Sequence, residues 1–480
     1  MGGMGRRVNG ILVLILILGA VLRLKGVTNP YLDDQGWRQA DTASMALNML
    51  GHLGDFPDVL FPMLNYDGAG PQPVELEFPF FPYLLAWTWT WLGWQDLWGR
   101  LWGICFSLLT IGGIYQFGKL ALSGRAGLWA AAFYAFLPLT TYYGRVVMPE
   151  PVAQAFSIWA LVAIVSWRNK PTRRHLWGAS ILMAGAVLAK LPQLMIFPVA
   201  LLLGFYPLRR KIGKLPVYSF LSLVLPMLYY SWVHFGAGEA SQFVSGILSH
   251  QVIEGSTGHG EILYKNLKSG LGLPLLLALM GIALMIQKKA FQKEGHLALL
   301  LWAGISSVYL VVICLRIPLD YYLIPLALPI VLLAGYALDV WGGDREGNGV
   351  PAFVVGIVLI GLLWVNQTLY YGSKYQWNEE LLTQAQWLRQ HTETDSVLVL
   401  SGAPPMTLYY SQRYGYRLIR DDSQAWEDLQ EMPGDYLVAL PDSRGEEFWQ
   451  RVEYAYPQVG PGVYQLKKTS SVGNSTLIEG

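Results

Sequence analysis

Apolar runs of about twenty residues recur along this chain from its beginning to residue 371, and they limit what it can fold into. A run of that length crosses a bilayer as a helix, because only helices and closed barrels satisfy their own backbone hydrogen bonds in lipid. Of the 480 residues, 53% are hydrophobic and 14% are charged, whereas soluble proteins carry about 25% charged residues. The sequence therefore predicts a polytopic α-helical membrane protein.

Charge, cysteine content and motifs exclude several other classes. The net charge of +1 shows no basic excess, so no nucleic-acid partner is expected. Cys105 and Cys314 both lie in apolar runs, which excludes a disulfide scaffold and a cysteine zinc site. The sequence has no P-loop, no Rossmann glycine fingerprint and no Ser-His-Asp layout, so a nucleotide-driven machine is not expected.

Twelve apolar runs are candidate spans, and the positions of lysine and arginine select eleven of them. The run at 78–95 contains two prolines near its start and four tryptophans, which prefer the headgroup level, so we interpret it as an interfacial or re-entrant helix. Without it, the basic loops after the second, fourth, sixth and eighth spans face the cytoplasm, as the positive-inside rule requires. The predicted spans are 8–24, 101–119, 126–143, 151–167, 176–190, 192–207, 215–234, 268–287, 297–314, 320–338 and 351–371.

This topology divides the chain into parts. Residues 1–371 form the membrane module, whose first outer loop, about 25–100, contains juxtamembrane helices. Residues 372–468 alternate helix-like and strand-like segments and predict a small extracytoplasmic α/β domain, and 469–480 are expected to form a disordered tail. We expect a multi-pass protein of the cell membrane, surrounded by lipid, with its C-terminal domain outside.

Acidic residues mark the outer loops. Asp33 and Asp34 follow the first span, and Asp41 lies on the helix expected next. Capping of that helix, where the dipole favours negative charge, is the structural interpretation of these acids. Glu150 starts a span in the next outer loop, where an acid is costly unless it pairs or has a function. Glu150 is thus a functional candidate, with N-terminal capping of its span as the alternative.

Cations and tyrosines are expected at the same outer ends. Arg145 precedes Glu150, Lys190 lies between two spans, and Arg316 stands just before the pair Tyr321–Tyr322. Snorkelling of Lys190 and an interfacial tyrosine belt are the structural alternatives. If these residues are functional, the cations suit a lipid phosphate, which lysine and arginine bind through charge-assisted hydrogen bonds.

These motifs and their order along the chain resemble those of the GT-C superfamily of membrane glycosyltransferases. The resemblance is strongest to the branch of protein O-mannosyltransferases and aminoarabinose transferases (family 39-like). Members carry an acidic pair after the first span and another acid in the second outer loop, as Asp33-Asp34 and Glu150 do here. Four further stretches of residues 5–340 resemble recurring family segments: "WRQADTASMALNM", "EFPFFPYLLAW" with Glu77, "GAVLAKLPQLMIFP" around Lys190, and "DYYLIPLALP". The family pair is usually Asp-Glu, so the order of Asp34, Asp33 and Asp41 as candidate base stays open.

The resemblance implies an inverting glycosyltransferase that moves a sugar from a polyprenyl-phosphate donor to an acceptor, whether protein, lipid or glycan, at the extracytoplasmic face. A carboxylate would act as general base, a contribution of about 10²–10⁴-fold. The leaving phosphate needs a cation, and the candidates are Arg38, Arg145, Lys190 and Arg316. The only cofactor that the sequence allows is a divalent metal, which the acids could hold.

Two other classes compete with this interpretation. A lipid transporter or flippase would favour charges in mid-span and paired broken helices. An assembly scaffold would use its outer domain to bind a partner. The acids gathered at the lipid–water boundary favour the enzyme.

Overall fold

The computed structural model describes residues 2–206, 212–237, 259–314, 317, 319–343, 350–402, 405–419, 422–440 and 445–466. The chain folds into two compact units. Unit 1 comprises Met1–Gln35, Met49–Pro62 and Pro73–Gln376, and unit 2 comprises Gly36–Asn48, Met63–Gln72 and Trp377–Gly480. Two segments of the predicted first outer loop therefore pack with the C-terminal part of the chain.

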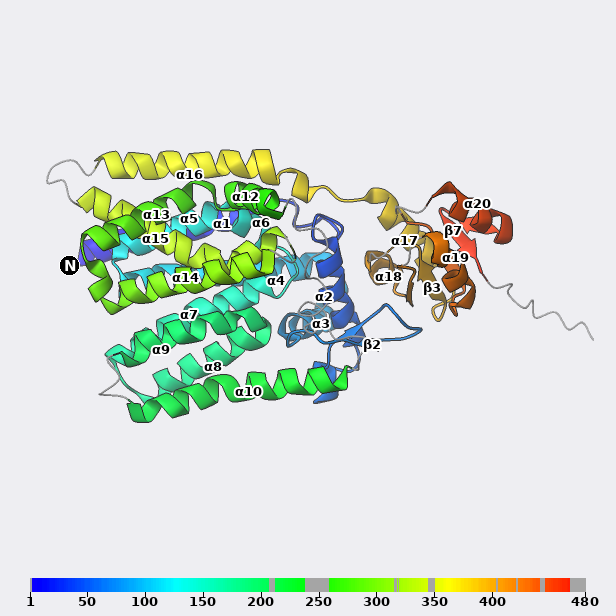
Figure 1. The fold of residues 1–480 in the computed structure, drawn as a ribbon, viewed down its shortest axis with the longest axis horizontal. Helices are drawn as coiled ribbons and strands as arrows, with labels where there is room; N and C mark the ends of the chain where they lie inside the picture. The colour runs from blue at the N-terminus through cyan, green and yellow to red at the C-terminus, as the bar shows by residue number, and fades with distance from the viewer. Residues whose placement is uncertain are drawn as a thin grey trace, which may run out of the picture. The chain divides into compact units, whose positions relative to one another are not determined.

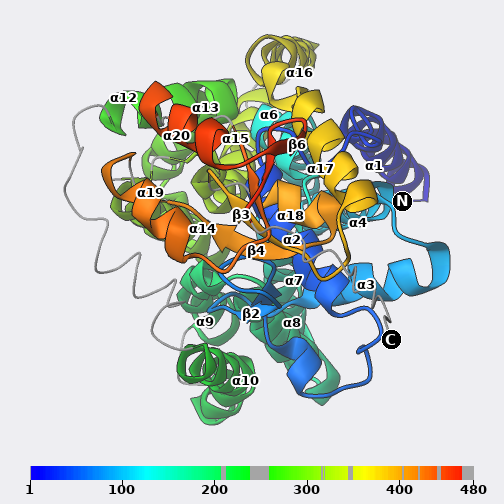
Figure 2. The ribbon, with the colours of Figure 1, turned by 90° about the vertical axis from the view of Figure 1, so that its right-hand side faces the viewer.

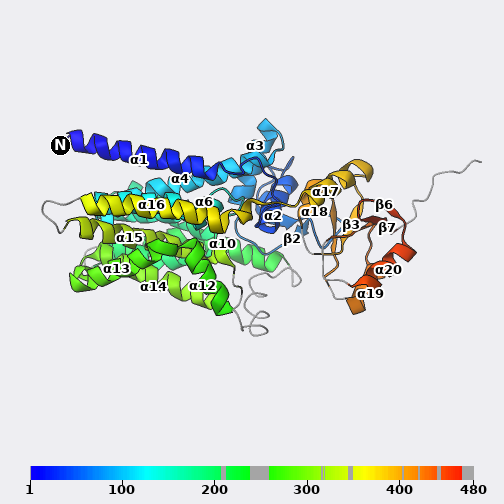
Figure 3. The ribbon, with the colours of Figure 1, turned by 90° about the horizontal axis from the view of Figure 1, so that it is seen from above.

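Unit 1 is a bundle of helices that run side by side (Figures 1 and 3). They are α1 (Gly2–Arg23), α4 (Asp96–Ala121), α5 (Gly124–Phe136), α6 (Pro138–Tyr143), α7 (Glu150–Asn169), α8 (Arg173–Ala189), η2 (Leu191–Ile196), α9 (Phe197–Phe205), α10 (Leu215–Gly236), α12 (His259–Gly270), α13 (Gly272–Gln287), α14 (Glu294–Cys314), α15 (Ile324–Gly343) and α16 (Val350–Tyr371). Each predicted span falls on one of these helices or on a consecutive pair, and the polytopic α-helical class is confirmed.

Six helices of the described residues are long and apolar enough to cross a membrane alone, and the pair α12–α13, bent by 91°, would make a seventh. The shorter helices include α3 (Phe80–Leu92), which covers the tryptophan-rich run and is not among these candidate spans. The predicted span 126–143 is broken at Leu137, whose backbone is extended before Pro138 begins α6. The residue before a proline is disfavoured in the helical region, which explains the break.

Small residues let the central helices approach closely. The α15 helix packs against both α5 and α13. A Cβ on Gly335 of α15 would overlap the backbone oxygen of Ala126 on α5. A Cβ on Gly281 of α13 would overlap the backbone oxygen of Leu333. Glycine is required at such contacts, and close backbone packing is the usual source of helix association in lipid.

The helices run in both directions along the bundle. One end of it collects the last residues of α1, α6, α8 and α16 and the first residues of α4, α7 and η7 (Asp320–Leu323). We call this the polar end. At the opposite end, the basic residues Arg125 and Arg168 pair with Asp339 and Glu294. The polar end includes Glu150, one of the acids that the sequence singled out, and the basic residues of the opposite end stand in or next to loops predicted to face the cytoplasm.

Unit 2 is a small α/β domain, as predicted. Its elements are α17 (Glu379–His391), β3 (Val397–Leu400), α18 (Met406–Ser411), β4 (Tyr414–Arg417), α19 (Asp422–Glu431), β5 (Tyr436–Val438), α20 (Glu446–Ala455), β6 (Gln458–Gly460) and β7 (Val463–Gln465). The strand order is β4-β3-β5-β7-β6; β3 is parallel to β4 and β5, and β7 is antiparallel to β5 and β6.

Alternation along β3 builds two hydrophobic layers, one on each face of the sheet. In Figure 2 the strands β3 and β4 lie between α19 and α18. Val399 packs in a cluster with residues of α19 and α20. Leu398 and Leu400 pack with Leu388 of α17 and Leu408 of α18. Successive side chains of a strand point to opposite faces, so "VLVL" serves both layers.

The segment after Asp34 belongs to unit 2. Helix α2 (Gly36–Asn48) packs against α18, and Asn48 accepts a hydrogen bond from Tyr414 on β4 at 3.0 Å. The guanidinium of Arg417 binds both carboxylate oxygens of Asp67, at 2.5 and 3.0 Å, and lies 4.0 Å from the ring centre of Tyr66. These contacts attach two pieces of the first outer loop to the edge strand of the sheet.

Replacing Arg417 with methionine is expected to loosen this attachment. The change keeps the apolar stem but removes the two-pronged ion pair and the contact with the Tyr66 ring, for a loss of about 1 kcal/mol because Asp67 is half-exposed. Amide hydrogen exchange should accelerate in residues 36–48 and 63–72 and stay unchanged in β3. Lysine at this position should be intermediate, since it keeps the charge without the fork. Unchanged exchange in α2 would contradict this role.

Candidate active site

Asp33 is buried at the polar end and is held by three donors. Its Oδ2 accepts hydrogen bonds from Arg145 at 2.7 Å and from Arg100 at 3.2 Å, and its Oδ1 accepts one from the hydroxyl of Tyr142 at 3.1 Å. All three charged side chains are fully buried. Arg100 also donates to the backbone oxygen of Pro30 at 2.9 Å. Asp33 thus fixes the loop after α1 to α4 and to the end of α6.

Asp34, the next residue, has a different environment. Its side chain is 36% exposed, and its Oδ2 lies 2.5 Å from the Nζ of Lys374, which follows α16. Lys374 also lies 3.1 Å from Asp320, which accepts a hydrogen bond from Tyr143 at 2.5 Å. Burial lowers the pKa of Lys374, but Asp320 and Asp34 outweigh that effect and raise the pKa above its usual value. Lys374 is therefore a cation held between two carboxylates.

Lys190 is held in the same manner. It follows the last residue of α8 and pairs with Glu150, the first residue of α7, and its Nζ lies 3.8 Å from Glu77. The ring centre of Tyr321 is 5.5 Å from this Nζ, and the hydroxyl of Tyr321 donates to that of Tyr322 at 3.0 Å. The polar end thus contains two lysines, each between two carboxylates.

Tyrosines connect these groups into one network. Lys374 lies 5.7 Å from the ring centre of Tyr142, whose hydroxyl binds Asp33. Tyr143 binds Asp320, and its ring lies 6.4 Å from that of Tyr321, beside Lys190. We call the connected set the polar-end network. It brings together eight predicted candidates: Asp33, Asp34, Glu77, Arg145, Glu150, Lys190, Tyr321 and Tyr322.

Three other predicted candidates are not in this set. Arg38 and Asp41 lie on α2 in unit 2, where their side chains are 3.9 Å apart. Arg316 lies outside the described residues.

Sequence reasoning missed Arg100 and Lys374, the partners of the two aspartates. Both stand in segments predicted to lie outside, where lysine and arginine are less common than in cytoplasmic loops. A cation on the wrong side by that rule is a signal that could have identified both residues. Asp320 begins the predicted span 320–338, but it is linked to Asp34 only through Lys374, which stands 340 residues after Asp34 in the sequence.

The predicted acids do not form a metal site. Across the ranges that the structure describes, no three His, Cys, Asp or Glu side chains come together in a metal-binding arrangement. Asp33, Asp34 and Glu150 each pair with a cation instead. Glu75 and His234 lie 2.8 Å apart, but they are only a pair. This donor set does not fit the carboxylate metal site that the sequence allowed.

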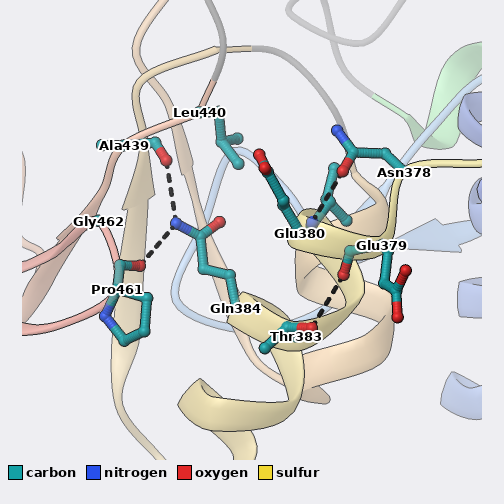
Figure 4. Close-up of a pocket in the computed structure, with 10 residues that line it drawn as sticks. Asn378, Glu379, Glu380, Thr383, Gln384, Ala439, Leu440, Pro461 and Gly462 are labelled. Carbon is teal, nitrogen blue, oxygen red and sulfur yellow. Dashed lines mark hydrogen bonds between the residues drawn. The ribbon is translucent and has the colours of Figure 1, made fainter.

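A separate pocket of about 520 Å³ lies in unit 2, at the first turn of α17 (Figure 4). Gln384 donates to the backbone oxygens of Ala439 and Pro461, both at 3.0 Å. Asn378 caps α17 by accepting from the backbone amide of Leu381 at 3.1 Å. These polar groups are satisfied within the domain, so they do not point to a ligand.

Comparison with known proteins agrees with this architecture. Residues 72–232 match the family model described as dolichyl-phosphate-mannose-protein mannosyltransferase. No curated protein matches the chain by sequence.

Among solved structures, ArnT from Cupriavidus metallidurans bound to undecaprenyl phosphate is 14% identical, with a TM-score of 0.62 over 95% of this chain and 98% of that one. The Archaeoglobus fulgidus oligosaccharyltransferase in complex with zinc and sulfate is also 14% identical, with a TM-score of 0.62 over 88% of this chain and 67% of that one. The archaeal oligosaccharyltransferase AglB from the same organism, in complex with an inhibitory peptide and a dolichol-phosphate, is 13% identical, with a TM-score of 0.60 over 89% and 69%. The GT-C resemblance noted in the sequence is confirmed, and the chain has the fold of the GT-C membrane glycosyltransferases.

Proposed function

We propose that this protein transfers one sugar from a polyprenyl-phosphate donor to an acceptor at the extracytoplasmic face of the cell membrane, with inversion at the anomeric carbon. The polar-end network carries the proposal. It gathers carboxylates and cations at one end of an apolar bundle, where a lipid-linked donor presents its phosphate and sugar. The likeness to folds solved with undecaprenyl phosphate and dolichol-phosphate supports this donor class.

Asp34 is the proposed general base. A base must reach the acceptor hydroxyl within hydrogen-bond distance. Asp33 is buried, and both of its oxygens are occupied by donors, whereas the side chain of Asp34 is partly exposed. Asp33 therefore holds the loop that presents Asp34. Asp41 on α2 is the alternative base.

Lys190 is the residue that we propose binds the phosphate of the donor. Its side chain is 15% exposed and already lies between Glu150 and Glu77, so an incoming phosphate would compete with two carboxylates for it. The hydroxyls of Tyr321 and Tyr322 are further donors nearby. Arg145 was a sequence candidate for this role, but it is fully buried against Asp33. We assign Arg145 to the support of the loop.

In the proposed reaction one bond forms and one bond breaks, while Asp34 receives the proton and Lys190 stabilises the negative charge. The acceptor oxygen forms a bond to the anomeric carbon while the bond from that carbon to the phosphate oxygen breaks. The acceptor proton passes to Asp34, and the electron pair leaves with the polyprenyl phosphate, whose charge Lys190 stabilises. Carboxylates close to the reacting carbon also stabilise positive charge that develops on the sugar ring.

The direct test uses the full chain in lipid nanodiscs. A panel of undecaprenyl-phosphoryl hexoses and pentoses is offered together with membrane extracts as acceptors, and released undecaprenyl phosphate is measured. We expect acceptor-dependent release from at least one donor. No release and no labelled acceptor with any donor of the panel would overturn the proposal.

Replacing Lys190 with glutamine is expected to weaken binding of undecaprenyl phosphate roughly 10- to 100-fold, because hydrogen bonds to charged groups contribute about 1.5–3 kcal/mol. Competition binding in nanodiscs measures the change. The matched control is Lys265→Gln, which removes an exposed lysine that also pairs with a glutamate, Glu261. Equal affinity of the Lys190 variant and the wild type would remove Lys190 from the phosphate site.

A further inference from the structure

A stripe of polar side chains continues from Glu150 into the bundle. Glu150, Gln154 and Ser157 are spaced four and three residues apart on α7, so they share one face of the helix. All three are buried, and Gln154 is 1% exposed. Gln154 lies about 6 Å deeper along α7 than Glu150, at about 1.5 Å per residue.

The two ends of the stripe are paired and its middle is not. Glu150 binds Lys190 through Oε1, and Ser157 donates to Gln193 of η2 at 2.9 Å. In contrast, neither Oε1 nor Nε2 of Gln154 has a hydrogen-bond partner among the residues described, and the buried Oε2 of Glu150 has none either. Three neighbouring polar atoms are thus left without partners inside an apolar bundle.

Such an arrangement is unfavourable for the protein by itself. A buried polar group without a hydrogen bond destabilises the fold, and leucine at position 154 would pack in the helix without that loss. Groups of this kind in native structures call for an explanation, of which a bound polar molecule is one. Polar residues within membrane helices mark functional sites for the same reason.

The neighbours of the stripe show which part of the bundle Gln154 faces. The residues on either side of Gln154 bind Lys190 and Gln193, so Gln154 faces the turn between α8 and α9. In that turn Lys190 is extended and η2 is a 3-10 helix. Irregular backbone at membrane depth occurs where it is buried in protein or lines a polar cavity.

We propose that Gln154, together with the Oε2 of Glu150, binds hydroxyl groups of the donor sugar and determines which sugar is accepted. This inference rests on the proposed function. A primary amide offers two donors and an acceptor, and a carboxylate oxygen offers an acceptor, which suits hydroxyls that both donate and accept. Glu150 binds the phosphate ligand Lys190 through its other oxygen, so the phosphate site and this sugar site are adjacent, as they are in a sugar phosphate ester.

The test measures how much the sugar adds to binding. Affinities for undecaprenyl phosphate and for a panel of undecaprenyl-phosphoryl sugars (glucose, mannose, galactose and arabinose) are measured in nanodiscs, and their ratio gives the sugar preference. Gln154→Leu is expected to lower the ratio for the preferred sugar roughly 5- to 100-fold, as loss of hydrogen bonds worth about 1–3 kcal/mol predicts. Binding of undecaprenyl phosphate should stay unchanged, and the Tm should be equal or higher.

Two further variants separate recognition from structure. Gln154→Glu keeps acceptors but loses the amide donors, so it should change the order of preference among the sugars. Ser157→Ala removes the paired member of the stripe, so it should lower the Tm and leave the ratio unchanged.

The possible outcomes distinguish a failure of the proposed function from a failure of the sugar-site inference alone. A wild type that releases undecaprenyl phosphate in the transfer assay, but binds every sugar-loaded lipid no more tightly than undecaprenyl phosphate, would overturn this inference alone. No release with any donor of the panel would overturn the proposed function, and this inference with it. A wild type that prefers one sugar, combined with a Gln154→Leu variant of equal preference, would overturn this inference alone. A Gln154→Leu variant with a lower Tm and weaker binding of both lipids would assign Gln154 to structure and also overturn it.

Discussion

Replacing Asp34 with asparagine is expected to lower sugar transfer about 10²–10⁴-fold, the usual contribution of a positioned general base. Asparagine has almost the same shape but cannot take up the acceptor proton. The side chain is partly exposed and its partner Lys374 keeps Asp320, so the fold should tolerate the change. Initial rates of undecaprenyl phosphate release measure the first effect, and the Tm of the same samples measures the second.

A control for this prediction lies in the same outer loop. Asp55 is 64% exposed and pairs with His52, so Asp55→Asn changes the charge of the loop without touching the polar-end network. Its transfer rate should equal that of the wild type. A fully active Asp34→Asn variant would exclude Asp34 as the base, and Asp41→Asn would then be the next variant to measure.

The helices could be predicted from the sequence because their signal is local. The length of an apolar run and the charges that flank it can be read from one short window of the sequence. Each predicted span falls on one helix or on a consecutive pair of helices. The break at Leu137 was not predicted, although the proline at position 138 is a local signal for it. In unit 2 the alternation of helix-like and strand-like segments predicted the α/β class, and the strand-like patterns at β3 and β5 are local as well, whereas β6 and β7 were not identified.

The partners of the site residues could not be predicted, because their signal is not local. Asp34 meets Lys374 across 340 positions, and Asn48 meets Tyr414 across 366. No window along the chain contains either pair. The attachment of α2 to the C-terminal domain depends on such contacts, and so it became visible only in the folded chain.

Asp33 and Asp34 show what the fold adds to a motif. The sequence presents two adjacent aspartates and gives no reason to order them. Burial separates them: one lies between two arginines, and the other lies partly in solvent beside a lysine. Substitution of Asp33 should therefore lower the stability of the protein, whereas substitution of Asp34 should lower activity and leave stability unchanged.

Replacing Asp33 with asparagine is expected to destabilise the protein by about 3–5 kcal/mol, because it leaves two fully buried guanidinium groups without their counter-ion. The Tm should fall, and the loss of activity should follow the loss of folded protein. The predicted difference from Asp34→Asn is thus visible in a thermal unfolding experiment, without any knowledge of the sugar.

A second substitution tests the physical reason. If the loss comes from unpaired buried charge, removing one of the two arginines as well should restore part of the stability, so Asp33→Asn combined with Arg100→Met should unfold at a higher temperature than the sum of the single changes predicts. Strict additivity would show that Asp33 does not stabilise the fold through Arg100. A single Asp33→Asn variant with the Tm of the wild type and no transfer activity would reverse the assignment, since a carboxylate that the fold does not need but the reaction does is the behaviour expected of the base.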